Sequence, residues 1–100
     1  MAKLPTIELS ADNTQLEAYR KPILAALNET GGRDYILNIA ASLGQSMKNA
    51  FNTTDYELDS GKIRWVKALQ VQGAIMNEEG LLTAPIPFVW ELTDTGRAQL

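Results

Sequence analysis

The segment of residues 62–73 constrains the fold most strongly, because it has the pattern of one amphipathic helix. At about 100° per residue, its apolar side chains fall on one side: Trp65, Val66 and Leu69. Basic and amide side chains at the spacing i, i+3, i+6 fall roughly opposite them: Arg64, Lys67 and Gln70. Asp59 or Ser60 is expected to cap this helix, and Gly73 to end it. The sequence therefore predicts a helix that is anchored on one side and presents a basic and amide face outward.

Residues 15–100 are predicted to form a single domain, preceded by a mixed, polar N-terminal arm of residues 1–14. The first helical stretch of the domain spans residues 16–28. Its apolar side chains fit one face: Leu16, Tyr19, Ile23, Leu24 and Leu27. The main helix is expected to begin near Pro22, which suits the start of a helix, and to end before Gly31-Gly32.

A second helix is predicted over residues 35–43, capped by Asp34 and ended by Gly44. Its apolar residues follow the spacing i, i+3, i+4, i+7 of a buried stripe: Ile36, Ile39, Ala40 and Leu43. Residues 45–61 carry the weakest pattern. One further helical turn is expected there to fill the core, with these apolar side chains: Met47, Ala50 and Phe51.

Two strand candidates follow the third helix, at residues 74–76 and 88–92. Residues 81–87 between them make a hairpin tip too long for a tight turn, and their two prolines keep it from pairing as a central strand. Thr93 is expected to cap a short final helix over residues 94–100. This order is that of a winged helix-turn-helix. The predicted fold class is α+β and mainly helical: three helices, a two-stranded wing and a short C-terminal helix.

The amino-acid composition excludes several classes of chemistry. The chain has no cysteine and no histidine, which removes thiolate chemistry, the Ser-His-Asp triad, the usual zinc ligands and the commonest general base. The acidic stretch that begins at Asp55 does not fit a calcium loop, because its sixth position is Ser60 rather than glycine. We therefore expect a protein that is not an enzyme, with no catalytic residue, no metal and no cofactor.

The hydropathy pattern gives no sign of a membrane or secretory segment. No apolar run approaches the ~20 residues of a membrane span. The N-terminus also lacks the long apolar segment of a signal peptide. We therefore expect a cytoplasmic protein with no membrane partner.

The charge is unevenly distributed along the chain. The net charge of −3 argues against a nucleic-acid partner, whose binding sites are normally basic. Residues 51–100 carry seven acids and four bases, however, and three of those bases lie close together: Lys62, Arg64 and Lys67. A local basic patch on an acidic protein is possible, although long-range attraction to phosphate would be poor.

Several segments carry a resemblance to a known family. They are Pro22-Ile23-Leu24-Ala25-Ala26-Leu27, Gly31-Gly32, Lys62-Ile63-Arg64-Trp65, Leu69-Gln70-Val71-Gln72-Gly73-Ala74-Ile75 and Trp90-Glu91-Leu92-Thr93-Asp94-Thr95-Gly96. From about Leu16 to Leu100, the chain resembles the N-terminal winged-helix domain of the Mrr-type restriction endonucleases. The nuclease domain of such enzymes would follow this region. The resemblance therefore implies a stand-alone DNA-binding module without a nuclease domain, with a regulatory or restriction-associated role.

Double-stranded DNA is accordingly the predicted partner, with residues 62–73 as the recognition helix. The predicted DNA-binding residues are Lys62, Arg64, Lys67 and Gln70. Arginine and lysine bind guanine edges or phosphates, and glutamine binds adenine. Lys62 is expected at the start of the helix, where it would contact a phosphate. A solvated helix face is the alternative interpretation of the same residues.

The hairpin tip supports a second interpretation. It carries a set of apolar side chains: Leu81, Leu82, Ile86 and Phe88. They could lie in a minor groove as apolar wedges, or form a surface for a homodimer or a hetero-partner. The tip has no arginine or lysine, and Glu78 and Glu79 precede it. The alternative function is therefore a winged-helix module for protein–protein interaction or dimerisation that does not bind DNA.

Overall fold

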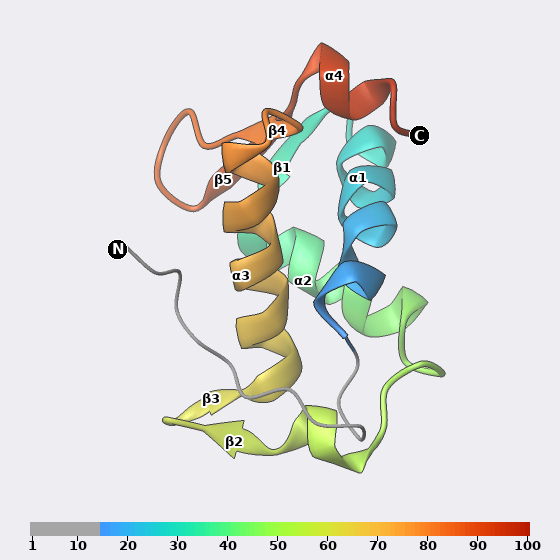
Figure 1. Cartoon of the computed structure of the whole chain (residues 1–100), viewed down its shortest axis with the longest axis vertical. Helices are drawn as coiled ribbons and strands as arrows, with labels where there is room; N and C mark the ends of the chain where they lie inside the picture. The colour runs from blue at the N-terminus through green and yellow to red at the C-terminus, as the bar shows by residue number, and fades with distance from the viewer. Residues whose placement is uncertain (1–14) are drawn as a thin grey trace.

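The computed structural model describes residues 15–100, and the predicted arm of residues 1–14 lies outside them. Three main helices make up most of this part: α1 (Arg20–Glu29), α2 (Ile36–Ser46) and α3 (Arg64–Glu78). A 3-10 helix, Leu16–Tyr19, leads into α1, and a short helix α4 (Asp94–Arg97) lies near the C-terminus. In Figure 1, α1 and α3 stand upright and α2 crosses behind them. The predicted fold class, α+β and mainly helical, is confirmed at this level.

An antiparallel sheet of three short strands lies at the C-terminal end of α3 (Figure 1). Its strands are β1 (Arg33–Tyr35), β4 (Leu82–Thr83) and β5 (Val89–Leu92), in the order β1-β5-β4. Asp34 lies opposite Trp90, and Leu82 lies opposite Leu92. The sheet thus joins a strand between the first two helices to a hairpin that follows the third.

A second, two-stranded hairpin lies at the opposite end of α3, between β2 (Leu58–Asp59) and β3 (Lys62–Ile63). Its two-residue turn consists of Ser60 and Gly61, both with positive φ, at 53° and 83°. Positive φ at both central residues is the geometry of a type I′ turn, which matches the twist of the paired strands. The prediction that Asp59 or Ser60 caps α3 is therefore wrong. Asp59 belongs to a strand, and Ser60 forms the turn.

The buried faces of the three helices agree with the predicted apolar stripes. The buried core residues of these helices and of the turn that leads into α1 include Tyr19, Ile23, Leu24, Leu27, Ile39, Leu43, Leu69 and Met76. Leu16, Ile36 and Ala40 are partly buried against this core. Met47 also fills the core, as predicted, while Ala50 is exposed. Helical spacing of apolar residues was therefore a reliable guide to which faces point inward.

The end of α3 differs from the prediction. The helix does not stop at Gly73 but continues to Glu78, so residues 74–76 are helical rather than a strand. Gly73 is buried beneath the Trp90 ring, which leaves no room for a Cβ atom. The actual stop is Gly80, whose φ is 79°. Hydrogen bonds from the Gly80 N–H to Asn77 O and from the Leu81 N–H to Met76 O form a Schellman motif there.

The start of α2 also differs from the prediction. Residues 33–35 form β1, and α2 begins at Ile36. The Asp34 carboxylate is not a helix cap; it accepts the adjacent Tyr35 N–H at 2.8 Å and the Asn38 side-chain N–H at 2.9 Å. Gly44 does not end α2, which continues to Ser46. Pairing of β1 with a strand more than fifty residues away set the start of this helix, and local periodicity carries no signal for such pairing.

The predicted cap at Thr93 is present. The Thr93 hydroxyl accepts the Gly96 N–H at 3.0 Å and caps α4, although α4 ends at Arg97 rather than Leu100. Within the weakly patterned residues 45–61, a second 3-10 helix forms at Thr53–Tyr56. Asn52 and Asp55 form a reciprocal capping box at its start.

Candidate functional site

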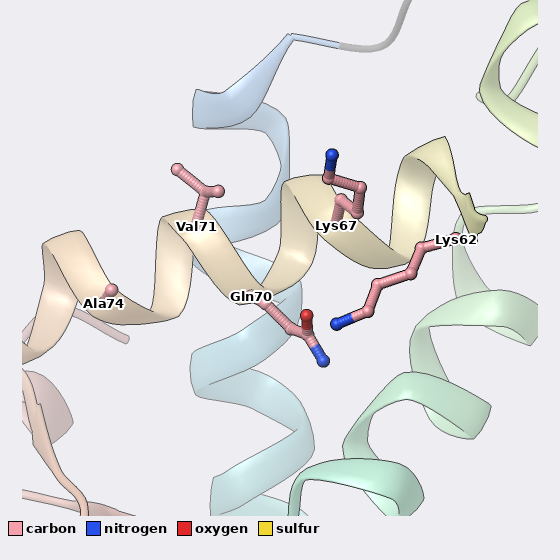
Figure 2. Close-up of a pocket in the computed structure, with 5 residues that line it drawn as sticks. All are labelled: Lys62, Lys67, Gln70, Val71 and Ala74. Carbon is pink, nitrogen blue, oxygen red and sulfur yellow. The ribbon is translucent and has the colours of Figure 1, made fainter. Parts of the chain in front are cut away.

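Three of the four predicted contact residues line one pocket on α3. Figure 2 shows this pocket, which has a volume of about 150 Å³ and is lined by Lys62, Lys67, Gln70, Val71 and Ala74. The ends of the Lys62 and Gln70 side chains point toward one another, whereas Lys67 projects from the other side of the helix (Figure 2). Arg64 is not among the lining residues. The lining of the pocket therefore includes two cationic groups, one amide and the apolar atoms of Val71 and Ala74.

Lys62 reaches this pocket from a strand, so its predicted place at the start of the helix is wrong. It lies in β3, directly opposite Asp59 of β2 in the hairpin register. The tight Ser60-Gly61 turn keeps the chain extended as far as Ile63, and the first helical residue is Arg64. The Lys62 side chain is exposed, and it makes no ion pair with any residue in the described range 15–100. Its position depends on the hairpin, whereas that of Gln70 depends on the helix.

Asp59 holds the other two basic side chains. Its Oδ2 atom lies 3.2 Å from the Lys67 Nζ and 4.0 Å from the Arg64 Nη1. All three side chains are largely buried, with exposed fractions of 25%, 17% and 21% for Asp59, Lys67 and Arg64. This ion-pairing role of Asp59 differs from the cap that was predicted for it. The sequence does contain a sign of this role: Asp59 directly precedes a Ser-Gly pair that is typical of a hairpin turn. Such a turn folds the strand that carries Asp59 back against the strand that leads into α3.

Aromatic packing fixes the start of α3. The Trp65 ring stacks on Phe51, with ring centres 5.1 Å apart and planes at 28°. Phe51 also meets Tyr56 edge-on at 5.8 Å and Tyr19 at 6.1 Å. On the other side, Gly44 of α2 brings its backbone close to Trp65, since a Cβ atom there would lie 3.5 Å from the ring. These contacts connect the 3-10 helix Thr53–Tyr56, α2 and the segment before α1 to the first turn of α3, which carries Arg64 and Lys67.

The buried polar groups next to this aromatic cluster have structural roles. The Asp55 carboxylate accepts the Asn52 N–H at 2.9 Å as part of the capping box. Burial, and to a smaller extent the Asp55 carboxylate, raises the pKa of Tyr19 well above its ordinary value of 10. The Tyr19 phenol therefore stays neutral throughout the physiological range and cannot act as a base. Its ring contributes to the core that supports α3.

The predicted partner surface on the hairpin tip is only half present. Leu81 and Leu82 are buried in the core, with 5% and 0% exposed, so their assignment to an exposed surface is wrong. Ile86 and Phe88 are exposed, as that prediction required. Tyr35 and Leu37 are also exposed, at 59% and 81%. Neither residue was predicted to be exposed, because local spacing places Tyr35 in a helix and shows no sign of β1, the strand that carries it.

The chain has no detected relative, and the described residues contain no metal-binding cluster or membrane-spanning helix. No family model, curated protein or solved structure matches the chain. Among residues 15–100, no group of three or more acidic side chains is placed to hold a metal ion. Within the same range, no helix has the length and apolar character needed to cross a bilayer. The interpretation of the α3 pocket therefore depends on its own geometry.

Proposed function

We propose that this chain is a small, non-enzymatic winged-helix protein that binds double-stranded DNA, with α3 as its recognition helix. The order of elements supports this proposal best. Helix α1, strand β1, helices α2 and α3 and strands β4 and β5 follow one another, with the sheet order β1-β5-β4. A winged helix-turn-helix has this order, with the hairpin β4–β5 as its wing and its third helix presented to the major groove.

The outward face of α3 supplies the chemistry for groove binding. Gln70 is exposed and has the donor and acceptor pair that fits an adenine edge. Ala74 can contact the methyl group of a thymine. Lys62, on the adjacent hairpin, is free to reach a phosphate. Lys67 and Arg64 can join them once DNA phosphates replace Asp59 as their counter-charge.

The resemblance to the N-terminal domain of the Mrr-type endonucleases supports the same assignment. Two of the segments that carry it, residues 62–65 and 69–75, fall on β3 and α3, which form the candidate interface. The role that this resemblance implies is gene regulation, or the targeting of a separately encoded restriction component.

A second candidate function, a protein-interaction module, is favoured by apolar exposure on the β2–β3 hairpin. Leu58 and Ile63 face each other across that hairpin and are 68% and 40% exposed, and Tyr56 beside them is 51% exposed. Apolar side chains find few favourable contacts on DNA except as wedges in a minor groove. Failure of the chain to bind duplex in the following experiment would favour this second function.

Replacing Asp59 by asparagine is expected to strengthen DNA binding. The wild-type chain should bind a labelled duplex near the non-specific range of ~10⁻⁴–10⁻⁶ M at physiological salt. Asp59→Asn keeps the shape of the side chain but removes the charge that holds Lys67 and Arg64. Because each partly exposed pair contributes about 0.2–1 kcal/mol, we expect binding to become roughly 3–10-fold tighter. Fluorescence anisotropy at two salt concentrations measures both affinities.

Asp94→Asn is the matched control for this experiment. It changes the net charge equally, but Asp94 lies in α4, at the opposite end of the molecule from β2 (Figure 1). We expect its affinity to stay within about twofold of the wild type, because exposed charges separated by more than ~10 Å are largely screened. Absence of binding by the wild type and by Asp59→Asn would contradict the proposed function. Equal strengthening by both variants would show that only net charge matters.

A further inference from the structure

We propose that a second copy of this chain docks on an apolar patch beside the wing, with Phe88 of each copy entering a pocket of the other. The wing patch consists of Tyr35, Leu37, Ile86 and Phe88, which are 59%, 81%, 52% and 77% exposed. This inference goes beyond DNA binding and does not depend on it. The patch lies at the C-terminal end of α3, whereas Lys62 and Lys67 lie toward its other end (Figure 1).

The wing patch is built around a pocket. Tyr35 and Ile86 line this pocket, which has a volume of about 210 Å³. Val89 also lines it and is itself buried. The Ile36 N–H donates to the Phe88 carbonyl at 2.7 Å, and this bond connects the wing to the start of α2, where Leu37 lies. The patch is therefore one continuous surface formed by two segments about fifty residues apart in the chain.

Phe88 projects from this surface under backbone strain. Its φ is 65°, in the left-handed region that a bulky residue rarely adopts. Its ring nevertheless gains little from the fold, because 77% of the residue is exposed. Backbone strain that buried contacts do not offset is common at functional sites. Here the strained backbone presents an aromatic ring next to an apolar pocket.

The presence of a projecting ring and a pocket on the same surface points to a second copy as the occupant. A two-fold symmetric interface places one patch against its own copy, so each projection needs a recess in that same patch. Arg33 and Asp34 also line the pocket and carry opposite charges. Arg33 pairs with Glu91 of its own chain at 2.9 Å, and a two-fold axis can bring this arginine of one copy toward Asp34 of the other.

The exposed area of the patch agrees with a modest dimer interface. Two aromatic and two aliphatic side chains at these exposures present roughly 500 Å² of apolar surface, at the upper end of the largest patches on monomers. A standard interface needs about 800 Å² per partner, and the polar rim can supply the remainder. DNA is a poor occupant, because residues 77–90 contain no arginine or lysine and include two glutamates.

Sedimentation of the whole chain tests this inference directly. The wild type should show a monomer–dimer equilibrium in the micromolar range, as expected for an interface of this size. Phe88→Asn removes the ring and places asparagine, which tolerates a positive φ, at a strained position. It should keep or raise the melting temperature while weakening dimerisation at least tenfold. Leu100→Asn, at an exposed leucine that belongs to neither apolar surface, should leave the dimer unchanged.

A crosslinking measurement supports the sedimentation test. The chain has no cysteine, so Ile86→Cys introduces a single thiol at the pocket. Mild oxidation should give a disulfide-linked dimer, and adding Phe88→Asn should suppress that product. A wild type that stays monomeric at millimolar concentration would overturn the proposal. Unchanged dimerisation of Phe88→Asn would overturn it as well.

Discussion

Replacing Leu69 by alanine is expected to lower the free energy of unfolding by about 2–5 kcal/mol. Leu69 lies in the middle of α3 and is completely buried in the core. Removing its branched end leaves a cavity that the surrounding helices cannot fully close. Because small domains have a total stability of only about 5–15 kcal/mol, the variant would lose a large fraction of it. Urea denaturation followed by circular dichroism gives the change.

Gln70→Ala is the control for this prediction, one position further along the same helix. Gln70 is exposed and lines the outer pocket, so its replacement should change the free energy of unfolding by less than about 0.5 kcal/mol. The contrast between two adjacent residues tests which face of α3 points inward. Equal losses of stability in the two variants would show that the inward and outward faces of α3 are assigned wrongly. The pocket lined by Gln70 would then not be an exposed surface.

Replacing Lys62 and Lys67 together by alanine is expected to weaken DNA binding by roughly 10–100-fold, or about 1.4–2.8 kcal/mol. Each phosphate contact contributes about −0.9 to the slope of log affinity against log salt concentration. With three or four contacts, the wild-type slope should be about −3, and the double variant should show about −1. Anisotropy titrations over a series of salt concentrations measure both quantities.

A second double variant, Lys21→Ala with Lys48→Ala, makes the same change in net charge elsewhere. Lys21 lies in α1 and Lys48 follows α2, and both are exposed. Affinity and salt slope should stay close to the wild-type values in this control. A similar loss in both double variants would indicate that the chain binds DNA through general charge rather than through the face of α3.

The parts of the fold that the sequence predicted are those governed by local spacing. Apolar residues at helical intervals correctly identified the buried faces of α1 and α2 and the inward position of Leu69 in α3. The side chains of Arg64 and Lys67, predicted to face outward, are only 21% and 17% exposed. Gly73 misled the prediction because a glycine that ends a helix and a glycine that admits a neighbouring ring look alike in a sequence. Only the position of Trp90, seventeen residues later, distinguishes the two cases. Gly80 is also a glycine near the end of the helical pattern, and it is the glycine that actually terminates α3.

The parts that were missed depend on contacts between distant or oppositely directed segments. Strand β1 exists because residues 33–35 pair with β5, and three residues are too few to show a strand periodicity. In the candidate site, four residues were predicted on one helix: Lys62, Arg64, Lys67 and Gln70. The structure instead places Lys62 on a hairpin and the other three on α3, and adds Asp59 as the counter-charge of Arg64 and Lys67. Ion pairing of this kind follows from tertiary geometry, which residue spacing alone does not specify.

Chemical-shift mapping of the whole chain with a short duplex tests most directly whether α3 binds DNA. A ¹⁵N-labelled sample titrated at low salt should show its largest amide shift changes at Lys62, Lys67, Gln70 and Ala74, the residues of the pocket in Figure 2. Amides facing the groove between α1 and α2, such as those of Ala25 and Ser42, should change little. No shift changes at a saturating duplex concentration, or changes confined to that groove, would contradict the proposal that α3 is a recognition helix.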